Sequence, residues 1–166
     1  MSTVETFEHA LDGLAVETTR LAPEAFEEVL EEVITEPAVG ARPAVEGVSL
    51  EDTSVVLDPT PRQLEEAVTG VTGAVLGIAD YGSVVLSSTP DGTEPVSLFC
   101  DEHVVVLDAE DVVPDMPTAI GWMAANIGDA RESAIIATGP SATADMGALV
   151  RGAHGPKRVH VLIVES

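Results

Sequence analysis

Short, continuous apolar runs rich in valine and isoleucine constrain this chain more than any other feature of its sequence. They are SVVLD at 54–58, GAVLGIA at 73–79, SVVLSS at 83–88, HVVVLD at 103–108, SAIIAT at 133–138 and RVHVLIVE at 158–165. Because the runs do not alternate apolar and polar residues, they predict strands that are buried on both faces. Helical segments lie between them, which indicates an α/β fold with a mostly parallel central sheet and helices on both faces.

Helix signals occur between these runs and before them. The predicted helices cover residues 3–14, 23–34, 60–68 and 116–128. Thr60, Pro61 and Gln63 form the clearest start signal, because together they make a capping box with proline in the first turn. Residues 35–53 have two prolines, two glycines and no clear period, so they predict a loop or linker. We therefore expect an N-terminal helical arm and linker at 1–53 and an α/β domain at 54–166, within one compact unit overall.

The chain is strongly acidic, with 29 Asp and Glu against 7 Lys and Arg and a net charge of −22. This charge excludes nucleic acid as a plausible partner, since affinity for a phosphate backbone comes from Lys and Arg. The acids are dispersed, and their mutual repulsion is largely screened at molar salt, where the Debye length is about 3 Å. We expect a halophilic source, and the alternative is an ordinary acidic protein.

The sequence predicts a cytoplasmic protein without a membrane span, a metal or a cofactor. No apolar run reaches the roughly 18–20 residues that span a bilayer, and the N-terminus lacks the pattern of a secretory signal. Cys100 is the only cysteine, so we expect no disulfide and no thiolate cluster, and we interpret it as a small buried residue. His103, His154 and His160 have no metal-ligand spacing, and His160 is expected to be a packing residue.

Two glycine–proline turns lie close together near the C-terminal end. In the first, GPSATAD, the chain turns at Gly139 and Pro140 and is predicted to start a helix near Ser141 to Thr143. A hydroxyl there can cap the helix, and the free N–H groups of a helix N-terminus can bind a phosphate or carboxylate. Capping alone does not require Ser141, Thr143 and Asp145 together, so capping and ligand binding both remain open.

In the second turn, GAHGP, Gly152 is expected to end the preceding helix, and Gly155 with Pro156 directs the chain into the last strand. His154 has a usual pKa near 6.5, so it could act as an acid, a base or an anion partner, or be an ordinary surface residue. We expect both turns to meet at the carboxyl end of strand 133–138, because ligands of open α/β sheets bind at that edge.

The order and spacing of these turns resemble the C-terminal signature of the LUD-domain proteins, the lactate-utilisation protein C (LutC/YkgG) group. That signature has G-P-S-x-T-A-D about a dozen residues before G-x-H-G-P and a final strand. The segments GVTGAVLGIADYGSVVL and VSLFCDEHVVVLD are similar to upstream parts of the family, so the resemblance covers roughly residues 60–166. Tyr81 and Gly147 replace the family's usual Thr and Glu, and the usual proline before His103 has no counterpart.

The resemblance implies a fold like the NagB/RpiA/CoA-transferase group and a part in oxidising L-lactate to pyruvate with iron–sulphur partner subunits. One cysteine cannot hold a cluster, and no GxGxxG follows a strand, so this chain itself would lack a redox centre. It would bind a small carboxylate, another anion or the partner subunits, in an oligomeric state that stays open. The candidate residues are Asp80, Asp145 and His154 for catalysis, and Gly82, Gly139, Pro140, Ser141, Thr143, Gly152 and Gly155 for ligand binding. Two alternatives remain: an independent transferase or isomerase of this fold group, and a non-catalytic scaffold or regulator.

Overall fold

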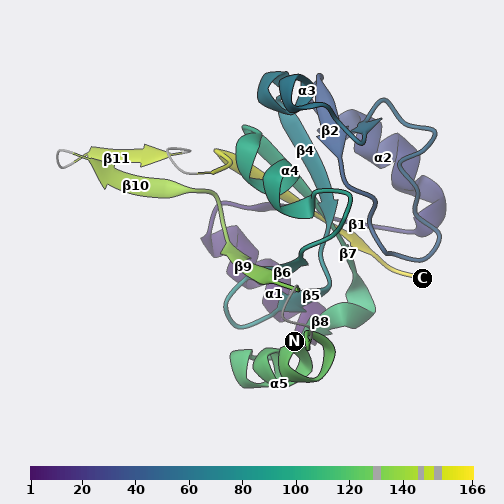
Figure 1. Cartoon of the computed structure of the whole chain (residues 1–166). Coiled ribbons are helices and arrows are strands. Elements are labelled where there is room, and N and C mark those ends of the chain that lie inside the picture. The colour runs from purple at the N-terminus through teal and green to yellow at the C-terminus, as the bar shows by residue number, and fades with distance from the viewer. Residues whose placement is uncertain (129–131, 146–147, 152–154) are drawn as a thin grey trace.

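A six-stranded parallel sheet forms the centre of the molecule (Figure 1). The computed structural model of the chain describes residues 1–128, 132–145, 148–151 and 155–166. The central strands are β1 (Glu17–Leu21), β2 (Ala38–Gly40), β3 (Val56–Leu57), β4 (Thr69–Gly73), β7 (Glu102–Asp108) and β12 (Arg158–Val164). They lie in the order β1-β12-β7-β4-β2-β3, and every neighbouring pair is parallel. The predicted α/β class with a mostly parallel central sheet is confirmed.

A second, smaller sheet packs on one face of the central sheet. Its strands are β5 (Leu76–Ile78), β6 (Ser83–Ser87), β8 (Val112–Val113) and β9 (Ala134–Thr138), in the order β8-β5-β6-β9. The predicted pairing of 73–79 with 83–88 is confirmed, because β5 and β6 are antiparallel neighbours. The strand predicted at 133–138 also exists, but it pairs antiparallel with β6. Its expected place in the central sheet is therefore wrong.

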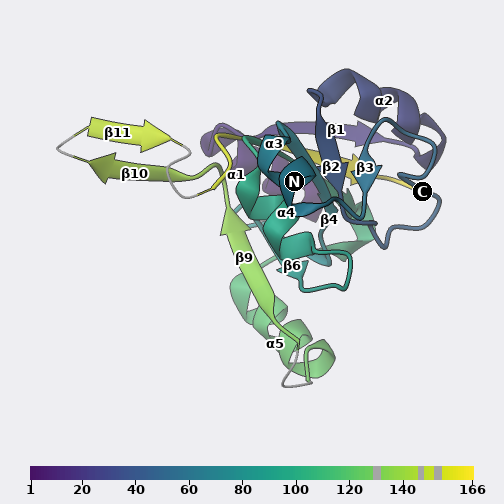
Figure 2. The same cartoon turned by 45° about the horizontal axis from the view of Figure 1, so that its top comes forward.

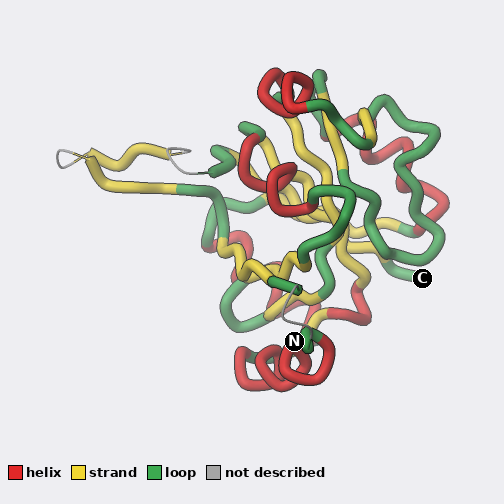
Figure 3. Tube along the Cα trace, in the orientation of Figure 1, coloured by secondary structure: helices red, strands yellow, loops and turns green. Residues whose placement is uncertain are grey.

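Helices cover both faces of the central sheet, as predicted (Figure 3). They are α1 (Thr3–Gly13), α2 (Phe26–Val33), α3 (Pro61–Glu66) and α4 (Thr93–Phe99). Helix α5 (Met116–Asn126) packs on the second sheet instead, and short 3₁₀ turns are η1 (Pro23–Ala25) and η2 (Ala109–Asp111). The capping box at Thr60 starts α3, which confirms that start signal. Helix α4 was not predicted. None of the described helices is both long and apolar enough to cross a membrane.

The faces of the sheet are built from alternating side chains of its central strands. Val104 of β7 packs with Phe26 of α2 on one face, and Val105 packs with Phe7 of α1 on the other. Phe7, Phe26, Val104 and Val105 are all nearly inaccessible to solvent. The first 53 residues therefore supply core side chains and two strands of the central sheet. A domain boundary at residue 53 would divide the central sheet and its core.

Strands β1 and β2 were not predicted, and β2 lies inside the segment interpreted as a loop. The sequence of β1, Glu-Thr-Thr-Arg-Leu, is mostly polar, because β1 is an edge strand that buries only Leu21. β2 has three residues, which is too short for any period to show. The strand predicted as buried at 54–58 is a two-residue edge strand in which Val56 is exposed.

A two-stranded hairpin projects from the body of the molecule in both Figure 1 and Figure 2. It consists of β10 (Ala142–Asp145) and β11 (Ala148–Arg151), which are antiparallel. The helix predicted to begin near Ser141 to Thr143 and to end at Gly152 is therefore wrong. A Ser or Thr after Gly-Pro is equally suited to a turn into a strand, so this local signal does not distinguish a helix from a hairpin.

Candidate functional site

A cavity with a volume of about 360 Å³ lies between the central sheet and the second sheet. Its walls are mainly apolar side chains of α1, β6, β9 and β12, among them Leu11, Leu86, Ala137 and Val161. Ser97, His103, Thr138 and Ser141 supply side-chain polar groups. Pockets of roughly 300–1,000 Å³ with apolar walls and a few polar groups are typical small-molecule sites.

The described parts of the two predicted turns meet at this cavity. Ser141 donates its backbone N–H to the carbonyl oxygen of Pro156 at 2.8 Å. A Cβ added to Gly155 would lie 3.2 Å from the Cβ of Ser141. Gly139 and Pro140 line the cavity together with these three residues. The turn after β9 and the turn before β12 are therefore neighbours, although they are separated by the hairpin.

The cavity lies at the carboxyl end of strand 133–138, as expected, and also at the amino ends of the central strands. His103 is the second residue of β7, Val159 is the second residue of β12, and Val16 directly precedes β1; all three line the cavity. The carboxyl end of β9 also lines the cavity, but β9 belongs to the second sheet. The rule for open parallel sheets therefore does not apply to the strand from which the location was predicted.

His103 is a buried ionisable residue of the cavity wall, with an exposed fraction of 3%. Its Nε2 lies 2.8 Å from Oγ1 of Thr72 on the adjacent strand β4. Burial lowers the pKa of His103 to about 4, so the imidazole is neutral at neutral pH. The sequence placed His103 within a segment resembling the family but did not include it among the site residues, because the family's usual proline before this histidine has no counterpart here.

Helix α4 reaches the cavity because a glycine lets it lie directly on β4. A Cβ on Gly70 would come within 2.3 Å of the Val96 carbonyl oxygen and 3.0 Å of Cys100 Sγ. This contact places Ser97 in the cavity wall, where its hydroxyl donates to the carbonyl of Glu94. Burial raises the pKa of the Cys100 thiol to about 11, which agrees with the predicted packing role.

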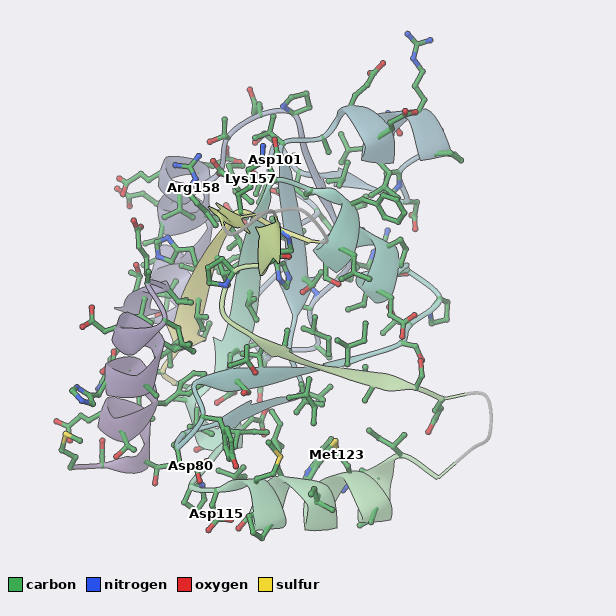
Figure 4. All side chains as sticks on the ribbon, turned by 90° about the vertical axis from the view of Figure 1, so that its left-hand side faces the viewer. Asp80, Asp101, Asp115, Met123, Lys157 and Arg158 are labelled. Carbon is green, nitrogen blue, oxygen red and sulfur yellow. The ribbon has the colours of Figure 1, made fainter. Side chains whose placement is uncertain are left out.

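Two cationic side chains follow Pro156 next to the cavity, and each is paired with an acid (Figure 4). Lys157 Nζ lies 3.6 Å from Asp101 Oδ1. Arg158 forms an ion pair with Glu102, whose side chain is largely buried. These pairs join the start of β12 to the start of β7.

The predicted site residues fall into three groups. Those that line the cavity are Gly82, Gly139, Pro140, Ser141 and Gly155. Asp80 is exposed and does not line it; in Figure 4 Asp80 lies beside Asp115, at the opposite end of the molecule from Lys157 and Arg158.

The remaining predicted residues are Thr143, Asp145, Gly152 and His154. Thr143 and Asp145 are strand positions of β10 whose side chains lie outside the described part. Gly152 and His154 lie outside the described residues altogether. The catalytic and binding roles proposed for these residues therefore stay predictions.

His160 has a structural environment of its own on the opposite side of β12. Its Nε2 lies 2.8 Å from Thr19 Oγ1, and its Nδ1 lies 3.4 Å from Glu17 Oε2 on the neighbouring strand β1. Burial lowers the pKa of His160. These contacts join two strands, as expected for a packing residue. Among the described residues, no cluster of three or more His, Cys, Asp or Glu is arranged to hold a metal.

The fold is that of an α/β protein with a parallel central sheet and a cavity beneath a second sheet. Residues 8–164 match the LUD domain, and the chain therefore belongs to the LUD-domain family. This match begins well before residue 60, where the resemblance in the sequence became recognisable.

Curated relatives of the chain include lactate utilization protein C of Bacillus licheniformis and the protein YkgG of Escherichia coli. The first is 35% identical over 112 residues, which cover 65% of this chain and 47% of the relative. The second is 32% identical over 129 residues, which cover 72% of this chain and 56% of the relative. The chain thus spans about half the length of the curated relatives it matches.

A solved structure supports the fold. The crystal structure of a DUF162 family protein from Deinococcus radiodurans, at 1.70 Å resolution, superimposes with a TM-score of 0.74. The superposition covers 99% of both chains at 19% sequence identity. At that identity the likeness concerns the fold alone.

Proposed function

We propose that this LUD-domain protein takes part in lactate utilisation, and that it contributes a small-molecule site rather than a redox centre. The observation that carries the proposal is the similarity to proteins named lactate utilization protein C, at 35% identity in Bacillus licheniformis and 30% in Deinococcus radiodurans. Because the matched regions cover only about half of these relatives, the activity of the whole relatives is part of the proposal.

Lactate oxidation releases electrons that this chain has no iron–sulphur cluster to accept. Converting L-lactate to pyruvate releases two electrons and two protons. An iron–sulphur cluster needs about four thiolates, and the only cysteine of the chain is buried Cys100. We therefore propose that iron–sulphur partner subunits accept the electrons, while this chain binds a ligand of the system or the partners themselves.

The cavity that contains His103 and Ser141 is the proposed ligand site. Its size and mixed lining support this role. The prediction of an anion site depended on the N–H groups of a helix beginning near Ser141, and that segment is a strand instead. Lys157 and Arg158 lie next to the cavity, but both are paired with acids. The size and lining of the cavity therefore support a small-molecule ligand, whereas the paired cations beside it do not indicate that this ligand is an anion.

The test is reconstitution with the proteins encoded beside it, purified together in about 2 M KCl to screen the acidic surface. The complex should contain iron and should reduce a dye when L-lactate is added. Ala137→Phe fills the cavity and should lower this rate at least about tenfold with unchanged iron content. Ala124→Phe, at an exposed position of α5, is the matched control and should leave the rate unchanged.

Two results would overturn the proposal. One is a lactate-dependent rate that is the same without this chain, and the other is a failure to co-purify with any iron-containing neighbour. Turnover of an acyl-CoA or a sugar phosphate by the purified protein alone would favour the independent-enzyme alternative.

A further inference from the structure

We infer that the cavity selects an uncharged molecule with an apolar body and an oxygen that accepts a hydrogen bond from His103, and that it discriminates against carboxylates. The inference rests on the proposed function, which places a ligand in this cavity. It goes further by naming the chemical class of the ligand and the group that orients it.

The walls of the cavity favour an apolar body. Leu11, Leu86, Ile135 and Val161 come from different elements and surround the space. Apolar ligand surface that they cover is removed from water, which favours binding. The polar groups are few, so they can orient one functional group of a ligand but cannot solvate a strongly hydrated one.

No Asp, Glu, Lys or Arg is among the described residues that line the cavity. A carboxylate that enters would lose its hydration without gaining a described counter-charge, which is unfavourable. Lys157 and Arg158 follow Pro156 of the cavity wall, and each is paired with an acid, Asp101 and Glu102 respectively. An amide or a ketone would enter without this penalty.

His103 points toward the cavity because of the alternation along β7. Val104 and Val106 pack on the face of α2, so His103 and Val105 face the opposite side, where the cavity lies. Nε2 of His103 is held by Thr72, and Nδ1 has no hydrogen-bond partner among the described residues. No side-chain nitrogen or oxygen of the described part is both sealed from solvent and without a partner. Nδ1 therefore has accessible surface, and His103 lines this cavity as well as a smaller pocket beside Ala15 and Glu17.

The hydroxyl of Thr72 sets which ring nitrogen carries the proton. Thr72 is fully buried, and among the described residues His103 Nε2 is the only side-chain partner of its hydroxyl. The 2.8 Å contact fits either direction, and we assign the hydroxyl as the donor to Nε2, because the opposite direction would leave the buried hydroxyl hydrogen unpaired. In the neutral imidazole the proton then resides on Nδ1. His103 thus offers one N–H donor to a ligand oxygen.

A carboxylate and its matching primary amide test the inference. 3-Phenyllactate and 3-phenyllactamide share the ring and the hydroxyl, and both fit a cavity of this volume. Calorimetric titration in about 2 M KCl near pH 7.5 should give at least tenfold tighter binding of the amide. Ala137→Phe should abolish this binding, while Ala124→Phe should not change it.

Histidine variants test the orienting group. His103→Phe keeps the ring shape but removes the donor, and it should weaken amide binding at least tenfold. His103→Asn places an N–H near the position of Nδ1, and it should recover part of that loss, which a purely structural role of His103 would not produce. His9→Phe, at an exposed histidine of α1, is the control.

The outcomes separate the inference from the proposed function. Equal or tighter binding of the carboxylate, or equal loss in the Phe and Asn variants, overturns the inference and leaves the cavity as a ligand site. If neither probe binds, or if Ala137→Phe has no effect on binding, both the inference and the proposed ligand site are overturned.

Discussion

Gly70→Ala is expected to be among the most disruptive single-methyl additions to this protein. Gly70 lies in the middle of the central sheet on β4, and α4 crosses directly above it. The new Cβ would lie 2.3 Å from the Val96 carbonyl oxygen and 3.0 Å from Cys100 Sγ. The carbonyl belongs to the helix backbone, so the contact cannot be relieved by a rotamer change.

The size of the effect follows from this distance. The Cβ-to-oxygen separation must grow by about 0.7 Å to reach even 3.0 Å, so α4 must move away from β4 as a unit. Overpacking of this kind costs about 1–3 kcal/mol. Because α4 carries Ser97 and Leu98 of the cavity wall, the same movement should also weaken binding of 3-phenyllactamide.

Urea unfolding at constant, high KCl measures the loss, and Gly121→Ala provides the comparison. Gly121 lies within α5, and a Cβ there would meet no heavy atom within 4 Å. Alanine in a helix interior is favoured over glycine by about 1 kcal/mol, so this variant should be more stable than the parent. If Gly70→Ala were as stable as the parent, the described packing of α4 on β4 would be refuted.

Three further predictions concern the core, the buried histidine and the surface charge. Phe26→Ala should lower the free energy of unfolding by about 3–5 kcal/mol, since Phe26 is 1% exposed. A loss below about 1 kcal/mol would mean that the N-terminal segment does not share the core. Since the pKa of His103 falls from 6.5 to about 4 on folding, the unfolded chain takes up a proton first as the pH falls. As the pH falls from 6.5 to about 4, the free energy of unfolding of the parent, measured by urea titration, should drop by up to about 3 kcal/mol more than that of His103→Gln. The same pH dependence of unfolding in both proteins would contradict the burial of a neutral imidazole. With a net charge of −22, the thermal midpoint should rise between about 0.1 and 2 M KCl, and a midpoint independent of salt would contradict the expected halophilic character.

The central strands were predictable because their side chains are apolar on both faces. Val104 to Leu107 of β7 are all buried, and such a run has few other interpretations. The edge strand β1 was not predictable in the same way, because only Leu21 of its five residues is buried. Its place in the sheet depends on parallel pairing with β12. The partner strand β12 lies more than a hundred residues further along the chain, beyond the reach of any local pattern.

The candidate site could be predicted only in part. Gly139, Pro140 and Gly155 stood out because glycine and proline punctuate turns wherever they occur. His103 did not stand out, because its partner Thr72 is 31 residues away and only the sheet brings the two together. The hairpin that replaces the predicted helix pairs β10 with β11, and the Gly-Pro-Ser signal before it is compatible with either structure.

The proposed ligand site depends most directly on the close approach of the turn after β9 to the turn before β12. An engineered disulfide between the two turns tests this approach. In Ser141→Cys/Gly155→Cys the two Cβ atoms would lie about 3.2 Å apart, close to the usual range of disulfides. Buried Cys100 should not compete, because the pKa of its thiol is raised to about 11. Mass spectrometry after mild oxidation should show an intramolecular cross-link in this double variant and free thiols in Ser141→Cys/Gly128→Cys. Free thiols in both double variants would mean that the turns do not share one cavity, and the site proposed for this protein would be wrong.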